Sequence, residues 1–124
     1  MDARSTQFTQ VYRQALSLLA EGHWEEALAP FSSLARSRPA DPGIQTGLGW
    51  CLLSTDRFRE AEQAFRQVIR LEPGNVIAIV GLVTALLTTG DYFEASSQAE
   101  RGLELEPGNP EQRLARVAQP FARK

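Results

Sequence analysis

The 124-residue sequence contains one cysteine, Cys51, and one histidine, His23. A structural zinc site takes four Cys or His ligands and a disulfide takes two thiols, so neither framework can form within the chain. His23 falls at a predicted turn, and the acids after it, Glu25 and Glu26, suit the first turn of a helix because they favour the helix dipole. Cys51 falls inside a predicted helix, where we interpret it as a packing residue. We therefore expect no enzymatic activity, no metal and no cofactor.

The sequence also lacks an excess of charge and a long apolar run. Lys plus Arg number 13 and Asp plus Glu 15, a net charge of −2, so no strong field favours nucleic acid or an acidic membrane surface. The most apolar stretch, 76–87, is shorter than the roughly twenty residues of a membrane span. The N-terminal residues lack the apolar core of a secretory signal. We expect a cytoplasmic protein with no nucleic-acid partner and no membrane insertion.

What the sequence does contain is a repeat with a step of thirty-four residues. Five columns keep this step: Pro39, Pro73 and Pro107; Ala27, Ala61 and Ala95; Gly22, Asp56 and Gly90; Trp24, Phe58 and Tyr92; and Leu18, Leu52 and Leu86. The pattern predicts an all-α fold of three amphipathic helix pairs, each closed by a proline because proline stops a helix. The expected pairs are 8–20 with 24–37, 42–54 with 58–71, and 76–88 with 92–105.

Residue types at the predicted helix boundaries agree with these pairs. Asp41 and Asn75 each precede the first helix of a pair, and Asn109 precedes the predicted capping helix. Asp and Asn are preferred N-cap residues. Asp56 replaces glycine at the second turn, and Asp tolerates a left-handed backbone better than most residues. The alanine column near the start of each second helix lets the two backbones of a pair approach closely.

These columns resemble the tetratricopeptide repeat, over residues 8–109. The resemblance implies a right-handed α-solenoid of three units, 8–41, 42–75 and 76–109. We expect residues 1–7 to form a flexible N-terminus and residues 110–124 to form a capping helix and tail, because a solenoid needs a polar terminal cap.

In this family the first helix of each pair lines the concave side of the solenoid, and the resemblance therefore implies a partner-binding groove. Its residues would be Tyr12, Leu16, Leu19, Thr46, Gly47, Trp50, Leu53, Ile77, Val80, Gly81, Thr84 and Leu87. The helix 76–88 is apolar on every face, and a helix of that kind is normally buried on every face. Its repeat neighbours can cover about half of it, so we expect another polypeptide to cover the rest.

Two groove positions, Gly47 and Gly81, lie in mid-helix, where glycine costs about 1 kcal/mol relative to alanine. Their recurrence at the repeat step has two explanations. The missing side chains allow a ligand to come close, or a neighbouring helix fills the space.

Two uses of the family can be compared with these residues. The carboxylate clamp for heat-shock proteins uses Lys, Asn and Arg, and none of these stands at the matching positions Tyr12, Leu16, Gly47, Ile77 and Gly81. The residues from 11 to 102, with Gly-His-Trp-Glu-Glu-Ala at 22–27 and Gly-Leu-Gly-Trp-Cys at 47–51, are similar to the class II chaperones of type III secretion. Those chaperones hold apolar segments of translocator proteins in the groove.

The sequence thus leaves two hypotheses of function. The first is a binding module or small chaperone whose groove takes an apolar peptide or helix of another protein, in a secretion system if the chaperone resemblance holds. The alternative is a self-assembling scaffold in which another copy fills the groove, as a homo-oligomer. Whether the groove binds a strand or a helix stays open.

Overall fold

The computed structural model describes residues 3–105, and within this range it contains six helices and no strand. The helices are α1 (Ala3–Ala20), α2 (Trp24–Ser37), α3 (Pro42–Ser54), α4 (Phe58–Leu71), α5 (Val76–Thr89) and α6 (Tyr92–Leu105). The predicted all-α fold is confirmed, and α2 to α6 match their expected bounds to within one residue. The predicted capping helix and tail, 110–124, and the predicted N-cap Asn109 lie outside the described residues.

The first helix differs from its prediction, because α1 begins at Ala3 and not at residue 8. Most of the segment 1–7, expected to be a flexible N-terminus, is therefore helical. No proline or glycine precedes residue 8, so nothing in the chain stops the helix from extending. The Thr9 hydroxyl donates a hydrogen bond of 2.9 Å to the carbonyl oxygen of Ser5, inside this added stretch. The repeat marks only where α1 begins to pack.

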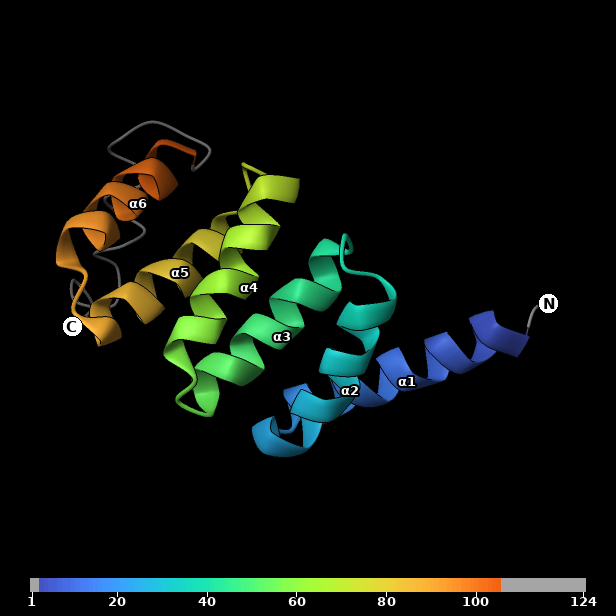
Figure 1. Cartoon of the computed structure of the whole chain (residues 1–124). Coiled ribbons are helices and arrows are strands. Elements are labelled where there is room, and N and C mark those ends of the chain that lie inside the picture. Colours follow the sequence, from blue (N-terminus) through green and yellow to red (C-terminus); the bar gives the residue numbers. More distant parts are fainter. Residues whose placement is uncertain (1–2, 106–124) are drawn as a thin grey trace, which may run out of the picture.

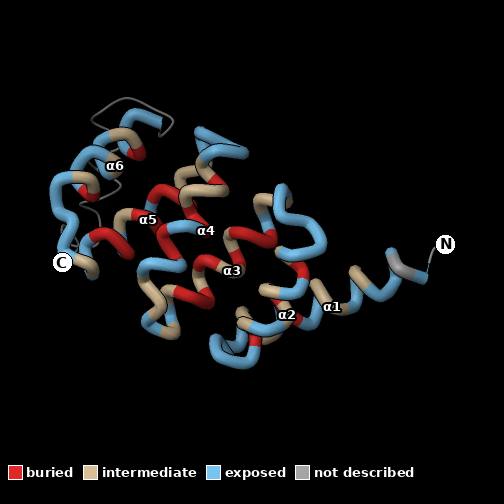
Figure 2. Tube along the Cα trace, in the orientation of Figure 1, coloured by how far each residue is buried: buried red, intermediate tan, exposed pale blue. Residues whose placement is uncertain are grey.

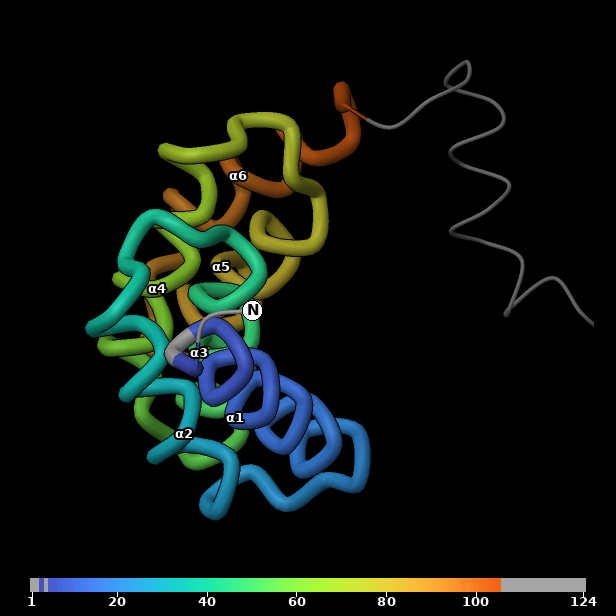
Figure 3. Tube along the Cα trace, turned by 90° about the vertical axis from the view of Figure 1, so that its right-hand side faces the viewer, coloured from blue at the N-terminus to red at the C-terminus, as the bar shows by residue number. Residues whose placement is uncertain are grey.

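The six helices form a two-layered stack of antiparallel pairs (Figure 1). Consecutive helices pack along the chain, and in addition α1 contacts α3 and α3 contacts α5. The backbones of α2 and α4, and those of α4 and α6, do not approach each other as closely within residues 3–105. Viewed from the side, α1 and α2 stand on opposite sides of the stack (Figure 3). Because α1, α3 and α5 lie closer to one another than α2, α4 and α6 do, they form the inner, concave layer.

The turns and caps follow the residue types predicted for them. Gly22, Asp56 and Gly90 all have a positive φ, of 79°, 64° and 85°. Each turn within a pair therefore has a left-handed backbone conformation at the same repeat position. The Asp41 carboxylate accepts a hydrogen bond of 3.2 Å from the backbone N–H of Ile44, and the Asn75 side chain accepts one of 3.0 Å from that of Ala78. Both predicted N-caps are confirmed.

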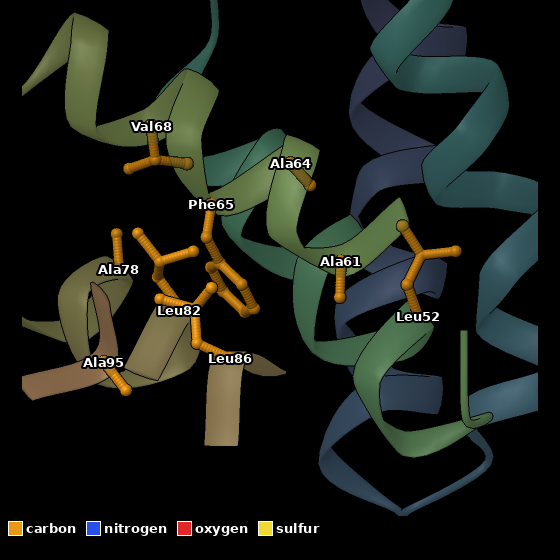
Figure 4. Close-up of a cluster of buried hydrophobic side chains, with 9 residues drawn as sticks. All are labelled: Leu52, Ala61, Ala64, Phe65, Val68, Ala78, Leu82, Leu86 and Ala95. Atoms are coloured by element: carbon orange, nitrogen blue, oxygen red, sulfur yellow. The ribbon is translucent and has the colours of Figure 1, made fainter. Parts of the chain in front are cut away.

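The core lies between the two layers and consists of two clusters of buried side chains (Figure 2). Phe31 is the largest buried side chain of one cluster and Phe65 of the other, and both are fully buried. Figure 4 shows the Phe65 ring extending from α4 toward Leu82 and Leu86 of α5. Each Phe therefore joins its own unit to the next one, and this contact holds the stack together.

Polar contacts also join the second unit to the third. The Arg66 guanidinium donates two hydrogen bonds, of 2.6 and 2.8 Å, to the two carboxylate oxygens of Glu94, which ties α4 to α6. The Thr89 hydroxyl donates a hydrogen bond of 3.0 Å to the buried Glu62 carboxylate, which ties α5 to α4. These contacts fix the orientation of α5, whose exposed side belongs to the candidate site.

Candidate partner-binding groove

The inner layer carries a hollow of about 540 Å³ between α1 and α3. Six of the twelve predicted groove residues line it: Tyr12, Leu16, Leu19, Thr46, Gly47 and Trp50. They recur at matching positions because the step of thirty-four residues keeps the same face of each first helix turned inward. The structure thus brings the three predicted residues of α1 and three of the four predicted residues of α3 together in one depression.

The predicted residues of α5 form an exposed apolar stripe at the same repeat positions. Ile77 is 62% exposed, Val80 50% and Leu87 49%, and Thr84 between them is also exposed. Their spacing of three and four residues places them on one side of the helix. They do not line the hollow, and Leu53 of α3 is partly buried beside the Phe65 cluster. We call the inward side of α1, α3 and α5, with the hollow and this stripe, the groove face.

The opposite side of α5 is covered by its repeat neighbours. Ile79, Leu82 and Leu86 are each 1% exposed. Their burial confirms the expectation that neighbouring helices cover about half of α5. The expectation that another polypeptide covers the rest stays a prediction.

The glycines of the groove do not serve to admit a ligand, which corrects one of the two explanations offered above. Gly47 and Gly81 are both buried. A Cβ atom at Gly47 would overlap the Phe31 ring, and one at Gly81 would overlap the Phe65 ring. Each ring belongs to the second helix of the preceding unit. The glycines are therefore notches for a neighbouring helix, and Gly47 contributes only its backbone to the hollow.

Two polar residues of the hollow, Glu72 and Asn75, are absent from the predicted site. They lie in the segment between α4 and α5, and the Asn75 amide donates a hydrogen bond of 2.9 Å to the Glu72 carboxylate. Residues 71–75 recur verbatim at 105–109, which was the available indication. Helix periodicity alone could not place them, because connecting segments do not follow it.

The aromatic residues of the hollow are held in place by packing. The Trp50 ring meets the Phe65 ring edge to face, with centroids 5.2 Å apart, and the Tyr12 ring meets Phe31 in the same way at 6.4 Å. Burial, with the nearby Asp41 carboxylate as a second cause, raises the pKa of the Tyr12 hydroxyl above its usual value. Tyr12 therefore presents a neutral phenol to the hollow near neutral pH.

The reactive side chains lie elsewhere. Cys51 is fully buried among apolar residues, and burial raises the pKa of its thiol to about 11. This supports its interpretation as a packing residue. His23 lies within 3.6 Å of Glu26 and 3.8 Å of Glu21 in an exposed turn, away from the groove face. Within residues 3–105 no three His, Cys, Asp or Glu side chains are placed to hold a metal ion.

A second hollow, of about 640 Å³, lies at the N-terminal edge between α1 and α2. Phe8 and Arg38 line it, and the Arg38 guanidinium stacks 3.6 Å above the Phe8 ring centroid. The repeat register does not place this hollow on the groove face.

None of the helices that the structure describes is both long enough and apolar enough to cross a membrane.

Three stacked helix pairs with an inner layer of first helices define an α-solenoid. Tetratricopeptide repeat family models match residues 12–76 and 56–117. The chain therefore belongs to the tetratricopeptide repeat family.

Solved structures of other proteins share this fold at low sequence identity. A MamA mutant matches with a TM-score of 0.79 and 20% identity, over 82% of this chain and 74% of that one. The second TPR domain of human RPAP3, in complex with an HSP70 peptide, matches with a TM-score of 0.76 and 23% identity, over 96% and 98%. The type III secretion translocator chaperone SycD of Yersinia enterocolitica matches with a TM-score of 0.78 and 21% identity, over 94% and 89%. No curated protein sequence matches significantly.

Proposed function

We propose that this protein is a non-catalytic binding module whose groove face takes an apolar segment of another protein. The observation that carries the proposal is the exposed stripe on α5, where Ile77, Val80 and Leu87 each leave about half or more of the side chain in water. Leu16 of α1, 46% exposed, is a further large apolar side chain on the groove face. Contiguous apolar surface of this kind on a soluble protein marks an interaction site.

The energetics allow a reversible complex. If the groove face offers about 500 Å² of apolar area, its burial contributes roughly 12 kcal/mol at ~25 cal/mol per Å². Loss of translational and rotational freedom on association costs about 4–15 kcal/mol and offsets much of this gain. The balance favours a partner that binds and is released, as a chaperone client would.

The named structural neighbours support a protein partner. The RPAP3 domain is in complex with an HSP70 peptide, and SycD is a secretion translocator chaperone. The peptide SGPTIEEVD ends in acids, whereas α3 and α5 of this chain contain no charged residue to receive them. An apolar client, in a secretion system as for SycD, therefore suits this groove better than an acidic C-terminus.

The test is to substitute the stripe and measure binding. Val80→Asp and Leu87→Asp each place an unpaired charge in the buried interface, so we expect each to weaken binding at least about tenfold. The partner is first identified by co-purification from the native host, and its affinity is then measured with both components purified. Circular dichroism should show unchanged helix content, because both positions are half exposed.

The matched control is Phe93→Asp on α6, where the parent side chain is 87% exposed but lies on the outer layer. This variant should bind the partner as the parent does. If both stripe variants retain full affinity, the groove assignment is wrong.

A second candidate function is self-assembly, and the exposed aromatic pair Tyr92 and Phe93 favours it. These side chains are 67% and 87% exposed at the start of α6. If they insert into the groove of another copy, the contact is heterologous and builds rings or filaments.

Light scattering on the purified chain tests this candidate. Self-assembly predicts a mass that rises with concentration and returns to the monomer in Phe93→Asp and in Val80→Asp alike. A monomer at all concentrations excludes it.

A further inference from the structure

Two of the three inner helices of this protein lack charged residues. α3 and α5 contain no charged residue, whereas α4 alone contains Arg59, Glu60, Glu62, Arg66 and Arg70. A charged side chain pressed against α3 or α5 would lose its hydration and find no opposite charge, which is unfavourable. Charge complementarity therefore requires that the surface an occupant presents to α3 and α5 be uncharged, whereas Arg13 on α1 and Glu72 at the hollow are charged.

The threonines of the groove face have already used their hydrogen-bond donors. The hydroxyls of Thr46, Thr84 and Thr88 donate to the carbonyl oxygens four residues earlier, at 2.7, 2.9 and 2.9 Å. Each of these side chains therefore turns an apolar methyl group, and no free donor, toward an occupant. The three behave in the groove much as valines would.

Most of the backbone of the groove face is also unavailable, because N–H and C=O groups inside a helix bond to each other; the N–H of Gly43, in the first turn of α3 beside the hollow, has no such partner. Among the side chains of the hollow, the Asn75 amide uses one of its two N–H groups on Glu72, which leaves its second N–H, the Tyr12 hydroxyl and the Trp50 indole N–H as the main donors. All three belong to the hollow, and the α5 stripe adds none. The groove face thus offers apolar contact with few hydrogen bonds.

The scarcity of hydrogen-bonding groups on the groove face favours one of the two kinds of occupant. An extended segment carries unpaired N–H and C=O groups along both edges, and those turned toward the groove would lose water without finding partners. An α-helix satisfies its own backbone, so only its side chains need to suit the surface.

The shape of the groove agrees with a helix. Leu16 and Val80 stand about half exposed on α1 and α5, while Trp50 of α3 between them is only partly exposed. The large side chains of α1 and α5 are therefore more exposed to solvent than Trp50 between them. The hollow of about 540 Å³ lies beside Thr46 and Trp50, where it leaves room for side chains of a helix. The space beside Gly43 is already filled by the Tyr12 hydroxyl.

We infer that the occupant of the groove face is an amphipathic α-helix of another protein, laid against the groove with an uncharged, apolar face. This assignment rests on the proposed function and narrows it, because the same groove could otherwise take an extended peptide.

A pooled peptide display library tests the assignment on the full-length protein. Half of the library carries apolar residues at helical spacing and half carries the same composition in alternation, as in a strand. We expect the helical half to be enriched. The best synthetic peptide should gain helical circular dichroism on binding, and a central Ala→Pro substitution in it should weaken binding at least about tenfold, because proline breaks a helix.

The other outcomes separate the inference from the proposed function. Enrichment of the alternating half, or binding without a gain of helix, would overturn the helix assignment and leave the groove function standing. Enrichment of neither half would overturn both the helix assignment and the proposed groove function. Competition by excess unlabelled Val80→Asp protein, whose own groove does not take the peptide, would identify a second copy as the occupant and overturn the assignment to another protein. Val80→Asp should abolish enrichment, whereas Phe93→Asp, equally charged but on α6, should preserve it.

Discussion

At the scale of single residues, the contact between an aromatic ring and a glycine determines how the units stack. Phe65 is fully buried, and a Cβ atom built on Gly49 of its own unit would come within 2.8 Å of its ring. Gly81 of the next unit receives the same ring from the other side. The Trp50 ring meets the Phe65 ring edge to face, with centroids 5.2 Å apart, and so limits the space into which Phe65 could move. The absence of side chains at these glycines is therefore a packing requirement.

We expect Gly81→Ala to destabilise the protein although alanine is the better helix former. Overpacking a well-filled core costs about 1–3 kcal/mol, whereas the gain in helix propensity is at most ~1 kcal/mol. Urea denaturation followed by circular dichroism measures the difference.

The control is Gly74→Ala, in the segment between α4 and α5, where no heavy atom lies within 4 Å of the added methyl group. Its stability should equal or slightly exceed that of the parent, because alanine has fewer unfolded conformations. Equal stability of Gly81→Ala and the parent would contradict the conclusion that the space at Gly81 is filled by the Phe65 ring.

At the scale of elements, each helix is defined by its own boundary residues, but the placement of one helix on another depends on specific pairs. The Arg66–Glu94 pair joins α4 to α6 with a bidentate geometry, and both side chains are about one-third exposed. The Arg66 guanidinium, through these hydrogen bonds, holds the pKa of the Glu94 carboxyl below its usual value of 4.5. The pair therefore links α6 to the stack in a pH-dependent manner.

We expect Glu94→Gln to lower the free energy of unfolding by up to about 1 kcal/mol at neutral pH. Because the folded-state pKa of Glu94 is lowered, this contribution is complete above pH 4.5 and is lost as the pH falls through the lowered value. Urea titrations of parent and variant at several pH values should therefore converge in acid. Glu104→Gln, an exposed change on the same helix, should show no such pH dependence; a constant difference for Glu94→Gln would contradict the role of the pair.

At the scale of the whole molecule, the groove face exists because the first helices pack closer together than the second helices do. This curvature brings Tyr12 and Leu16 of α1 beside Trp50 of α3, although more than thirty residues separate them. The same curvature turns the charged faces of α2 and α4 outward. One side of the stack is therefore apolar and the other is polar without any change in the repeat.

The two tryptophans provide a direct measure of groove occupancy. Trp50 lines the hollow, whereas Trp24 lies at the start of α2, 37% exposed. Binding of a partner should shield Trp50 from acrylamide quenching and shift its emission to shorter wavelength. The response should persist in Trp24→Phe and disappear in Trp50→Phe, which keeps an aromatic ring against Phe65. A response that follows Trp24 instead would place the partner outside the groove.

Most of the fold was predictable because it depends on neighbours in the chain. Asp41 and Asn75 cap the helices that follow them, and the Gly22, Asp56 and Gly90 column forms the three turns, as their residue types indicate. The start of α1 was not predictable from the repeat, because the residues before Phe8 have no counterpart that packs. The repeat register also predicted the six site residues, from Tyr12 to Trp50, that line the hollow.

The amino-acid sequence by itself determined the helices, their pairing and the inward-facing positions, since caps, prolines and apolar spacing act over a few residues. Only the tertiary structure decided that Gly47 and Gly81 accept Phe rings, that Glu72 and Asn75 border the hollow, and that one side of α5 remains in water. These features depend on distances between side chains far apart in the chain. Such distances are set by how the layers pack, and no local pattern encodes them.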